Sequence, residues 1–138
     1  MKRNALHQVV RLRRVVLDEA IQDFAECLRK ETEAGQTLRT IEAAIAREVD
    51  KAGDLDGSDA MVEAFGTWFR RARDDLQTAT TGFEQAQADT ARARAVMSAA
   101  RSALEAAESL NSNRQAEANR IEEHHQQNRL DDLAQRRR

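Results

Sequence analysis

Proline and tyrosine are absent from this sequence of 138 residues, and glycine occurs only five times. Without proline, nothing in the covalent chain forces a kink or a stop in a long helix. Four phenylalanines and one tryptophan, in a chain with 33% charged residues, are too few to build a thick globular core. The sequence therefore predicts an all-α chain that forms long helices rather than a thick globular core.

Cysteine and long apolar runs are also scarce. The single cysteine, Cys27, excludes an internal disulfide and fits a small, half-buried apolar residue in a reducing compartment. No uninterrupted apolar stretch approaches the length of a membrane span. Residues 1–14 carry five basic side chains but no continuous apolar core, so they do not resemble a secretory signal. We expect a cytoplasmic protein.

Two lines of residues repeat at every seventh position through the middle of the sequence. One carries mostly large side chains: Val62, Phe69, Leu76, Phe83, Thr90, Met97 and Leu104. The other is a phenylalanine followed by alanines: Phe65, Ala72, Ala79, Ala86, Ala93, Ala100 and Ala107. This spacing is typical of a helix in a left-handed coiled coil, and the alanines allow close approach of a partner helix. It predicts a helix over about 59–136.

The first third of the chain has an apolar line of its own, which predicts a helix over about 4–52. Its members are Val10, Leu17, Ile21, Phe24, Leu28, Leu38, Ile41, Ile45 and Val49. Residues 53–58 (GDLDGS) form a turn, in which Gly53 can supply a left-handed cap and Ser58 or Asp59 can accept hydrogen bonds from the next helix. A short turn between long amphipathic helices predicts an antiparallel coiled-coil hairpin, in a single domain over 1–138.

A turn centred at residues 55 and 56 predicts the register of this hairpin. Facing residues should have numbers that sum to 110 or 111, which pairs Leu28 with Phe83 and Gly35 with Leu76. Residue 1 then lies opposite residue 110. The second helix is therefore longer than the first and overhangs it from residue 111, where the seam becomes polar and an uncovered helix is marginal in water.

Features of enzymes are missing as well. No Gly-x-x-x-x-Gly-Lys phosphate loop occurs, and His124 and His125 are adjacent, so they point about 100° apart on a helix rather than towards one metal ion. Asp54 to Gly57 is too short for a calcium loop. We therefore expect no enzyme activity, catalytic residue, cofactor or metal site.

Three segments resemble the FliJ family, the stalk proteins of flagellar type III export. These are residues 6–13 (LHQVVRLR), 65–69 (FGTWF) and, most specifically, 130–137 (LDDLAQRR). The resemblance spans the whole chain and includes its length. It implies a cytoplasmic antiparallel coiled coil, similar to the γ stalk of rotary ATPases, that inserts its terminal end into a hexameric export ATPase and contacts the cytoplasmic domain of a membrane export gate.

We also predict which residues bind these partners, since leucines three residues apart beside arginines on the overhang, and the basic start of the first helix, suit a surrounding ring. The expected contacts with the ATPase ring are Arg11, Arg13, Arg14, Leu130, Leu133, Arg136 and Arg137. The expected contacts with the export gate are Leu38, Ile41, Ile45, Phe65, Phe69, Ala72 and Leu76. Such a stalk is a monomer, promotes assembly of the ATPase hexamer, also acts as a general chaperone component beside export chaperones, and reaches the inner membrane only through its partners.

The same heptad pattern is also compatible with other functions. The chain could be the equivalent stalk of a virulence-type type III secretion ATPase, or a homo-oligomerising coiled-coil scaffold. A nucleic-acid-binding zipper is disfavoured, because only five positive charges precede the seam and the turn pairs the helices within one chain. We therefore expect no nucleic-acid partner.

Overall fold

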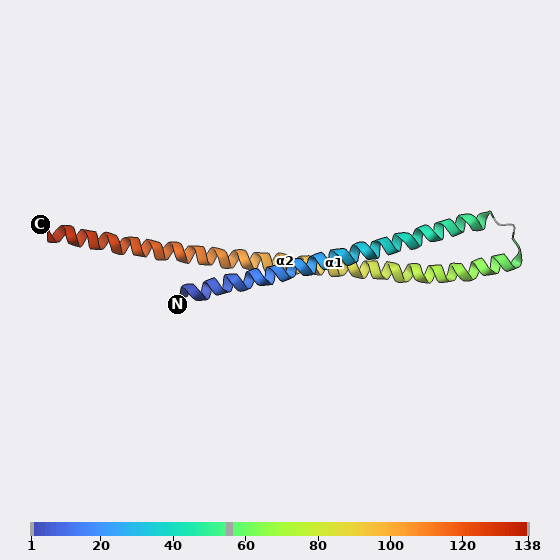
Figure 1. The fold of residues 1–138 in the computed structure, drawn as a ribbon, viewed down its shortest axis with the longest axis horizontal. Coiled ribbons are helices and arrows are strands. Elements are labelled where there is room, and N and C mark those ends of the chain that lie inside the picture. Colours follow the sequence, from blue (N-terminus) through green and yellow to red (C-terminus); the bar gives the residue numbers. More distant parts are fainter. Residues whose placement is uncertain (1, 55–56, 138) are drawn as a thin grey trace. The chain divides into compact units, whose positions relative to one another are not determined.

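The computed structural model describes residues 2–54 and 57–137, and these are almost entirely helical. Helix α1 spans Lys2–Gly53 and helix α2 spans Asp59–Arg136, with no strand in either described range (Figure 1). The two helices pack against each other as an antiparallel hairpin, which confirms the predicted all-α class. None of the described helices contains an apolar stretch long enough to cross a bilayer.

Local interactions explain why α1 and α2 run so far without interruption. Several helix-disfavouring threonines are accommodated because they donate the hydroxyl proton to the carbonyl four residues earlier, as Thr32 does to Leu28 and Thr37 to Glu33. The predicted cap at the start of α2 is confirmed for Ser58, whose Oγ accepts a hydrogen bond from the N–H of Met61 at 3.4 Å.

The end of α1 differs from the prediction. No described glycine has a positive φ, so Gly53 does not form a left-handed cap. The helix instead closes with a tight bond from the N–H of Asp54 to the carbonyl of Lys51, at 3.2 Å. Since Gly53 is exposed, water can satisfy the remaining carbonyls of the last turn.

The chain divides into two compact units, of which unit 2 comprises residues 21–96 and contains the turn. Its seam on α2 follows the two predicted heptad lines closely, because every member from Phe65 to Ala93 is buried or half-buried. Val62 is the exception and is exposed. In Figure 1, α2 begins beyond the last turn of α1, so this first turn of α2 has no helix opposite it.

The register of unit 2 is one heptad away from the predicted one. The ring of Phe83 lies against Gly35, Thr90 Oγ1 is 3.2 Å from the carbonyl oxygen of Cys27, and the guanidinium of Arg94 stacks on Phe24. These facing residues have numbers that sum to 117 or 118. The predicted pairs of Leu28 with Phe83 and Gly35 with Leu76 are therefore wrong, because the connection is not a symmetric turn about residues 55 and 56.

The seam of α1 was also assigned partly to the wrong residues. Ile21, Leu28 and Val49 are exposed, whereas Ala20 is buried and Cys27 is half-buried. The correct line continues three residues after Leu17 and Phe24 rather than four. The prediction chose the largest apolar residue in each turn and therefore placed the seam on a flank of the helix. The true seam contains small residues, which allow the closest approach of the partner helix.

Unit 1 comprises residues 1–20 and 97–138. Its core is a cluster of Val10, Leu104 and Ala107, against which Leu17 packs. Residues on α2 remain half-buried as far as Ala118, and every described residue from Asn119 to Arg137 is exposed. The part of α2 that packs against α1 thus ends about one heptad later than predicted, as expected from the shifted register. Within this unit, α2 continues well past the N-terminal end of α1 (Figure 1).

Candidate partner-binding surfaces

The last turns of α2 present an exposed apolar ridge beside basic side chains. Leu130 and Leu133 are 63% and 57% exposed. Their spacing of three residues places them on one face of the helix, and Arg136 and Arg137 follow within the next turn, also exposed. We call Leu130, Leu133, Arg136 and Arg137 the terminal ridge. Nothing among the described residues covers it, so it is free to bind a partner.

The basic first turns of α1 form a separate surface. Arg11, Arg13 and Arg14 are all exposed, and Arg14 Nη2 lies 3.3 Å from Glu108 Oε1 on α2. Glu108 precedes Leu130 by 22 residues, a rise of about 33 Å along a helix. The structure therefore does not bring the two halves of the predicted ATPase contact together, and one binding pocket could not hold both.

The residues predicted to bind an export gate lie between the helices. Ala72 is buried, and the other six are half-buried in the seam of unit 2: Leu38, Ile41, Ile45, Phe65, Phe69 and Leu76. Their packing already explains why they are apolar. A partner at this end of the hairpin would instead meet Val49, Met61 and Val62, which are exposed.

Aromatic side chains gather next to that exposed group. The ring of Phe65 stacks on Trp68 and on Phe69, with 5.9 Å between centroids in both pairs. All three are half-buried, so the cluster covers the end of the seam and keeps part of its surface in solvent.

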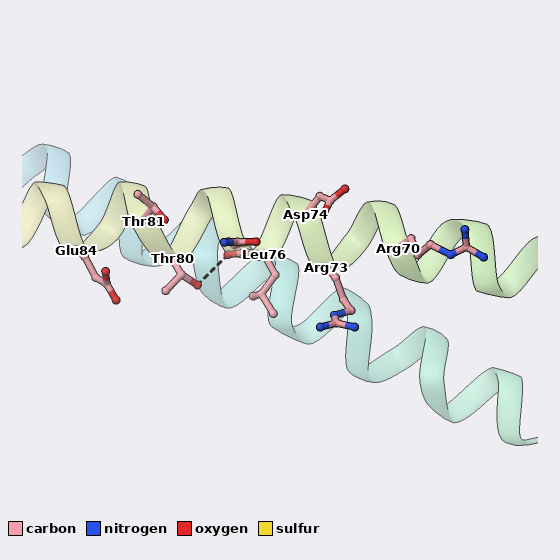
Figure 2. Close-up of a pocket in the computed structure, with 8 residues that line it drawn as sticks. Arg70, Arg73, Asp74, Leu76, Thr80, Thr81 and Glu84 are labelled. Atoms are coloured by element: carbon pink, nitrogen blue, oxygen red, sulfur yellow. Dashed lines mark hydrogen bonds between the residues drawn. The ribbon is translucent and has the colours of Figure 1, made fainter.

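Neither a small-molecule site nor a metal centre emerges from the described residues. One groove is lined by eight residues that all belong to α2, so no second element encloses a ligand there (Figure 2). Leu76 is the one large apolar residue of its lining, which also carries charges of both signs, including Arg73 and Glu84. No group of three possible metal ligands occurs in the described ranges, and His124 and His125 are exposed.

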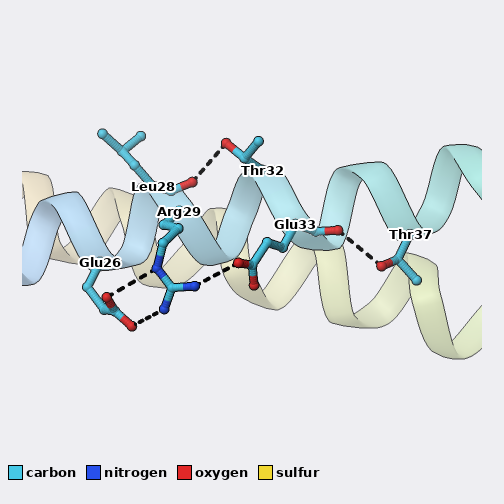
Figure 3. A network of polar contacts seen from close by, with 6 residues as sticks. All are labelled: Glu26, Leu28, Arg29, Thr32, Glu33 and Thr37. Atoms are coloured by element: carbon cyan, nitrogen blue, oxygen red, sulfur yellow. Dashed lines mark hydrogen bonds and ion pairs between the residues drawn. The ribbon is translucent and has the colours of Figure 1, made fainter.

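The strongest polar network lies on the surface of α1. Arg29 donates hydrogen bonds to Glu26 at 2.5 Å and to Glu33 at 2.7 Å, within one helix (Figure 3). The hydrogen bond and the charge of Arg29 lower the pKa of Glu26, and Glu26 raises the pKa of Arg29 in turn. Such exposed pairs three or four residues apart support a helix and do not indicate catalysis.

Sequence reasoning missed one exposed apolar surface, in unit 1. Val9, Leu12 and Val16 on α1 and Leu110 on α2 are all exposed. None belongs to a predicted seam line. The signal was available, because apolar residues at i, i+3 and i+7 beside a seam predict a second apolar stripe on the same helix.

Comparison with known proteins finds no relative of this chain. No family model, no curated protein and no solved structure matches the chain. The fold and the exposed surfaces are therefore the grounds for proposing a function.

Proposed function

We propose that this chain is the stalk of a flagellar type III export ATPase, seated in the hexamer through the terminal ridge. The observation that carries the proposal is that α2 stays helical through Arg136, although every described residue after Ala118 is exposed. A helix with this little cover is marginal in water by itself. A surrounding ring would supply the missing contacts.

The chemistry of the terminal ridge fits the inside of a protein ring. Burial of a leucine side chain contributes about 1.5–3 kcal/mol, so docking of Leu130 and Leu133 gives a ring a substantial affinity for this segment. Arg136 and Arg137 can form charge-assisted hydrogen bonds with carboxylates that line the ring. The same contacts, made to several subunits at once, would favour assembly of the hexamer and so stimulate ATP hydrolysis by the ring.

The opposite end of the proposed stalk would contact the export gate. Since the seam residues are engaged between α1 and α2, we assign this contact to the exposed Met61 and Val62 with the adjoining Trp68. In this proposal the stalk is a cytoplasmic adaptor, and its partners link it to the inner membrane and to export chaperones. The stalk of a virulence-type secretion ATPase would use the same two ends and is the alternative within this class.

A homo-oligomerising scaffold is a second candidate, and one observation favours it. Val9, Leu12, Val16 and Leu110 form an exposed apolar surface in a part of the hairpin that already has a packed seam. A stalk has no need of this surface within its own fold, whereas a scaffold would use it to associate.

The stalk proposal is tested with the cognate F1-like export ATPase. Deletion of residues 130–138 should abolish stimulation of ATP hydrolysis and cell motility, while helicity and thermal unfolding of the hairpin stay nearly unchanged, because the deleted segment has no cover. Leu130→Glu with Leu133→Glu should have the same effect in the full-length chain.

A matched control keeps the added charge but spares the ridge. Asn128→Glu with Gln135→Glu places two new carboxylates on the side of the same exposed stretch that faces away from Leu130 and Leu133, and should leave stimulation intact. Full stimulation by the truncated chain, over a titration in protein and in salt, would contradict seating through the terminal ridge.

A further inference from the structure

The two flanks of the seam in unit 1 differ in character. On one flank, Arg14 of α1 pairs with Glu108 of α2. Arg101 lies seven residues before Glu108, one heptad, and is therefore on the same side of α2. On the other flank, both helices carry only uncharged side chains over three turns. We call this second surface the uncharged face and define it by Val9, Leu12, Val16, Ala103, Ala106 and Leu110.

Most of the uncharged face is in contact with solvent. Leu12 is 61% exposed, and Val9, Val16, Ala106 and Leu110 are exposed as well, while Ala103 is half-buried. The face borders directly on the packed seam of Val10, Leu104 and Ala107. It therefore extends the existing interface sideways, and a further pair of helices could continue the same packing there.

Its large and small residues are segregated by helix. The α1 side carries branched side chains, and the α2 side carries alanines at its centre. Consider a second copy related by a twofold axis parallel to the helices, across the uncharged face. That rotation places α1 of each copy over α2 of the other, so that Leu12 of one copy packs on Ala103 and Ala106 of its partner. Large side chains then meet small ones in both directions.

We propose that the free chain forms a homodimer through the uncharged face, as an antiparallel four-helix bundle over unit 1. Charge supports a second copy as the occupant, because the α1 and α2 residues that meet across the twofold axis are all uncharged, so no like charges are brought together. The charged flank, with Arg14 and Glu108, stays in solvent.

The size of the face predicts the strength of the dimer. Twelve residues of α1 rise about 18 Å, and two helices are about 20 Å wide. A contact of this size buries on the order of 1,000 Å² over both copies, at the low end for specific interfaces. Dimerisation should therefore depend on concentration in the micromolar range.

Sedimentation velocity of the full-length chain from about 5 to 500 µM tests this inference. We expect a shift from monomer to dimer over that range. Leu12→Glu should weaken dimerisation at least tenfold, because two carboxylates would be buried against alanines. Ser98→Glu adds the same charge to an exposed position on the other flank and should leave the dimer unchanged. Circular dichroism verifies that both variants remain helical.

Crosslinking tests the arrangement itself. In a Cys27→Ser background, Leu12→Cys with Ala106→Cys should yield a disulfide-linked dimer, whereas Leu12→Cys alone should not, because the two copies of residue 12 lie diagonally across the bundle. A chain that is monomeric at every concentration, or a dimer that Leu12→Glu leaves intact, would overturn the proposal. Dimerisation of the free chain is measured without the ATPase, so the dimer proposal and the stalk proposal can fail independently of each other.

Discussion

The middle and the end of α2 belong to one continuous helix but are stabilised in different ways. Between Phe65 and Asn111, every third or fourth residue is buried or half-buried against α1. From Asn119 to Arg137, no described residue is even half-buried. The middle is held by packing of an apolar stripe, whereas in the free chain the end has only local helix propensity to support it and is marginal in water. The difference shows that a helix can extend beyond the part that packs against a partner helix, where its residues favour helix and no proline interrupts it.

A disulfide across the seam should produce the largest effect. Thr90→Cys places a thiol beside Cys27, whose carbonyl oxygen is 3.2 Å from Thr90 Oγ1. Oxidation should then give a crosslink within one chain and stabilise it by up to about 4 kcal/mol, because the loop that it closes is long. Thermal unfolding with and without reductant measures the gain.

The register predicted from a symmetric turn supplies the control. In that register, residue 83 lies opposite Cys27, so Phe83→Cys would crosslink instead of Thr90→Cys. Preferential oxidation of the Phe83→Cys variant within one chain would show that the observed register is wrong.

Leucine truncations compare the covered and uncovered parts directly. Leu104→Ala should cost about 3 kcal/mol, since Leu104 is only 9% exposed in the core of unit 1. Leu133→Ala should change stability by less than about 0.5 kcal/mol, because its side chain lies in solvent. Urea unfolding of both variants at low protein concentration measures the contrast. Equal losses would mean that the terminal ridge is packed in the free chain.

Two glycines provide the smallest and most local comparison. Gly82→Ala should stabilise the protein by about 0.5–1 kcal/mol, because a Cβ at this exposed helical position meets no atom within 4 Å. A Cβ on Gly35 would lie 3.1 Å from Cε2 of Phe83, so the ring would have to move. Gly35→Ala should therefore be less stable than Gly82→Ala by about 1 kcal/mol.

The double variant Gly35→Ala with Phe83→Leu shows whether the ring is responsible. If the clash with Phe83 sets the cost, the alanine should be better tolerated in the Phe83→Leu background than in the native one. An equal cost in both backgrounds would rule out this explanation.

Most of the fold and the residues of the terminal ridge could be predicted from the sequence, but the uncharged face could not. Ser58 as the cap, the two heptad lines of α2 and the long second helix all follow from local chemistry, which acts within a few residues. The exposed uncharged face was missed because hydrophobicity alone does not distinguish seam residues such as Val10 from flanking ones such as Val9. That distinction depends on where the partner helix lies.

The sequence by itself determined which face of α2 is buried, because its two heptad lines define one stripe. In α1, neighbouring apolar lines compete, and only the position of α2 decided which of them is buried. The sequence could not determine the register, since sliding one helix by seven residues returns the same stripes to the same seam. Only tertiary structure made that choice, through features that do not repeat: the space over Gly35 that receives the ring of Phe83, the hydroxyl of Thr90 beside the carbonyl of Cys27, and Arg94 over Phe24. A periodic pattern specifies orientation around a helix, and irregular contacts are needed to specify position along it.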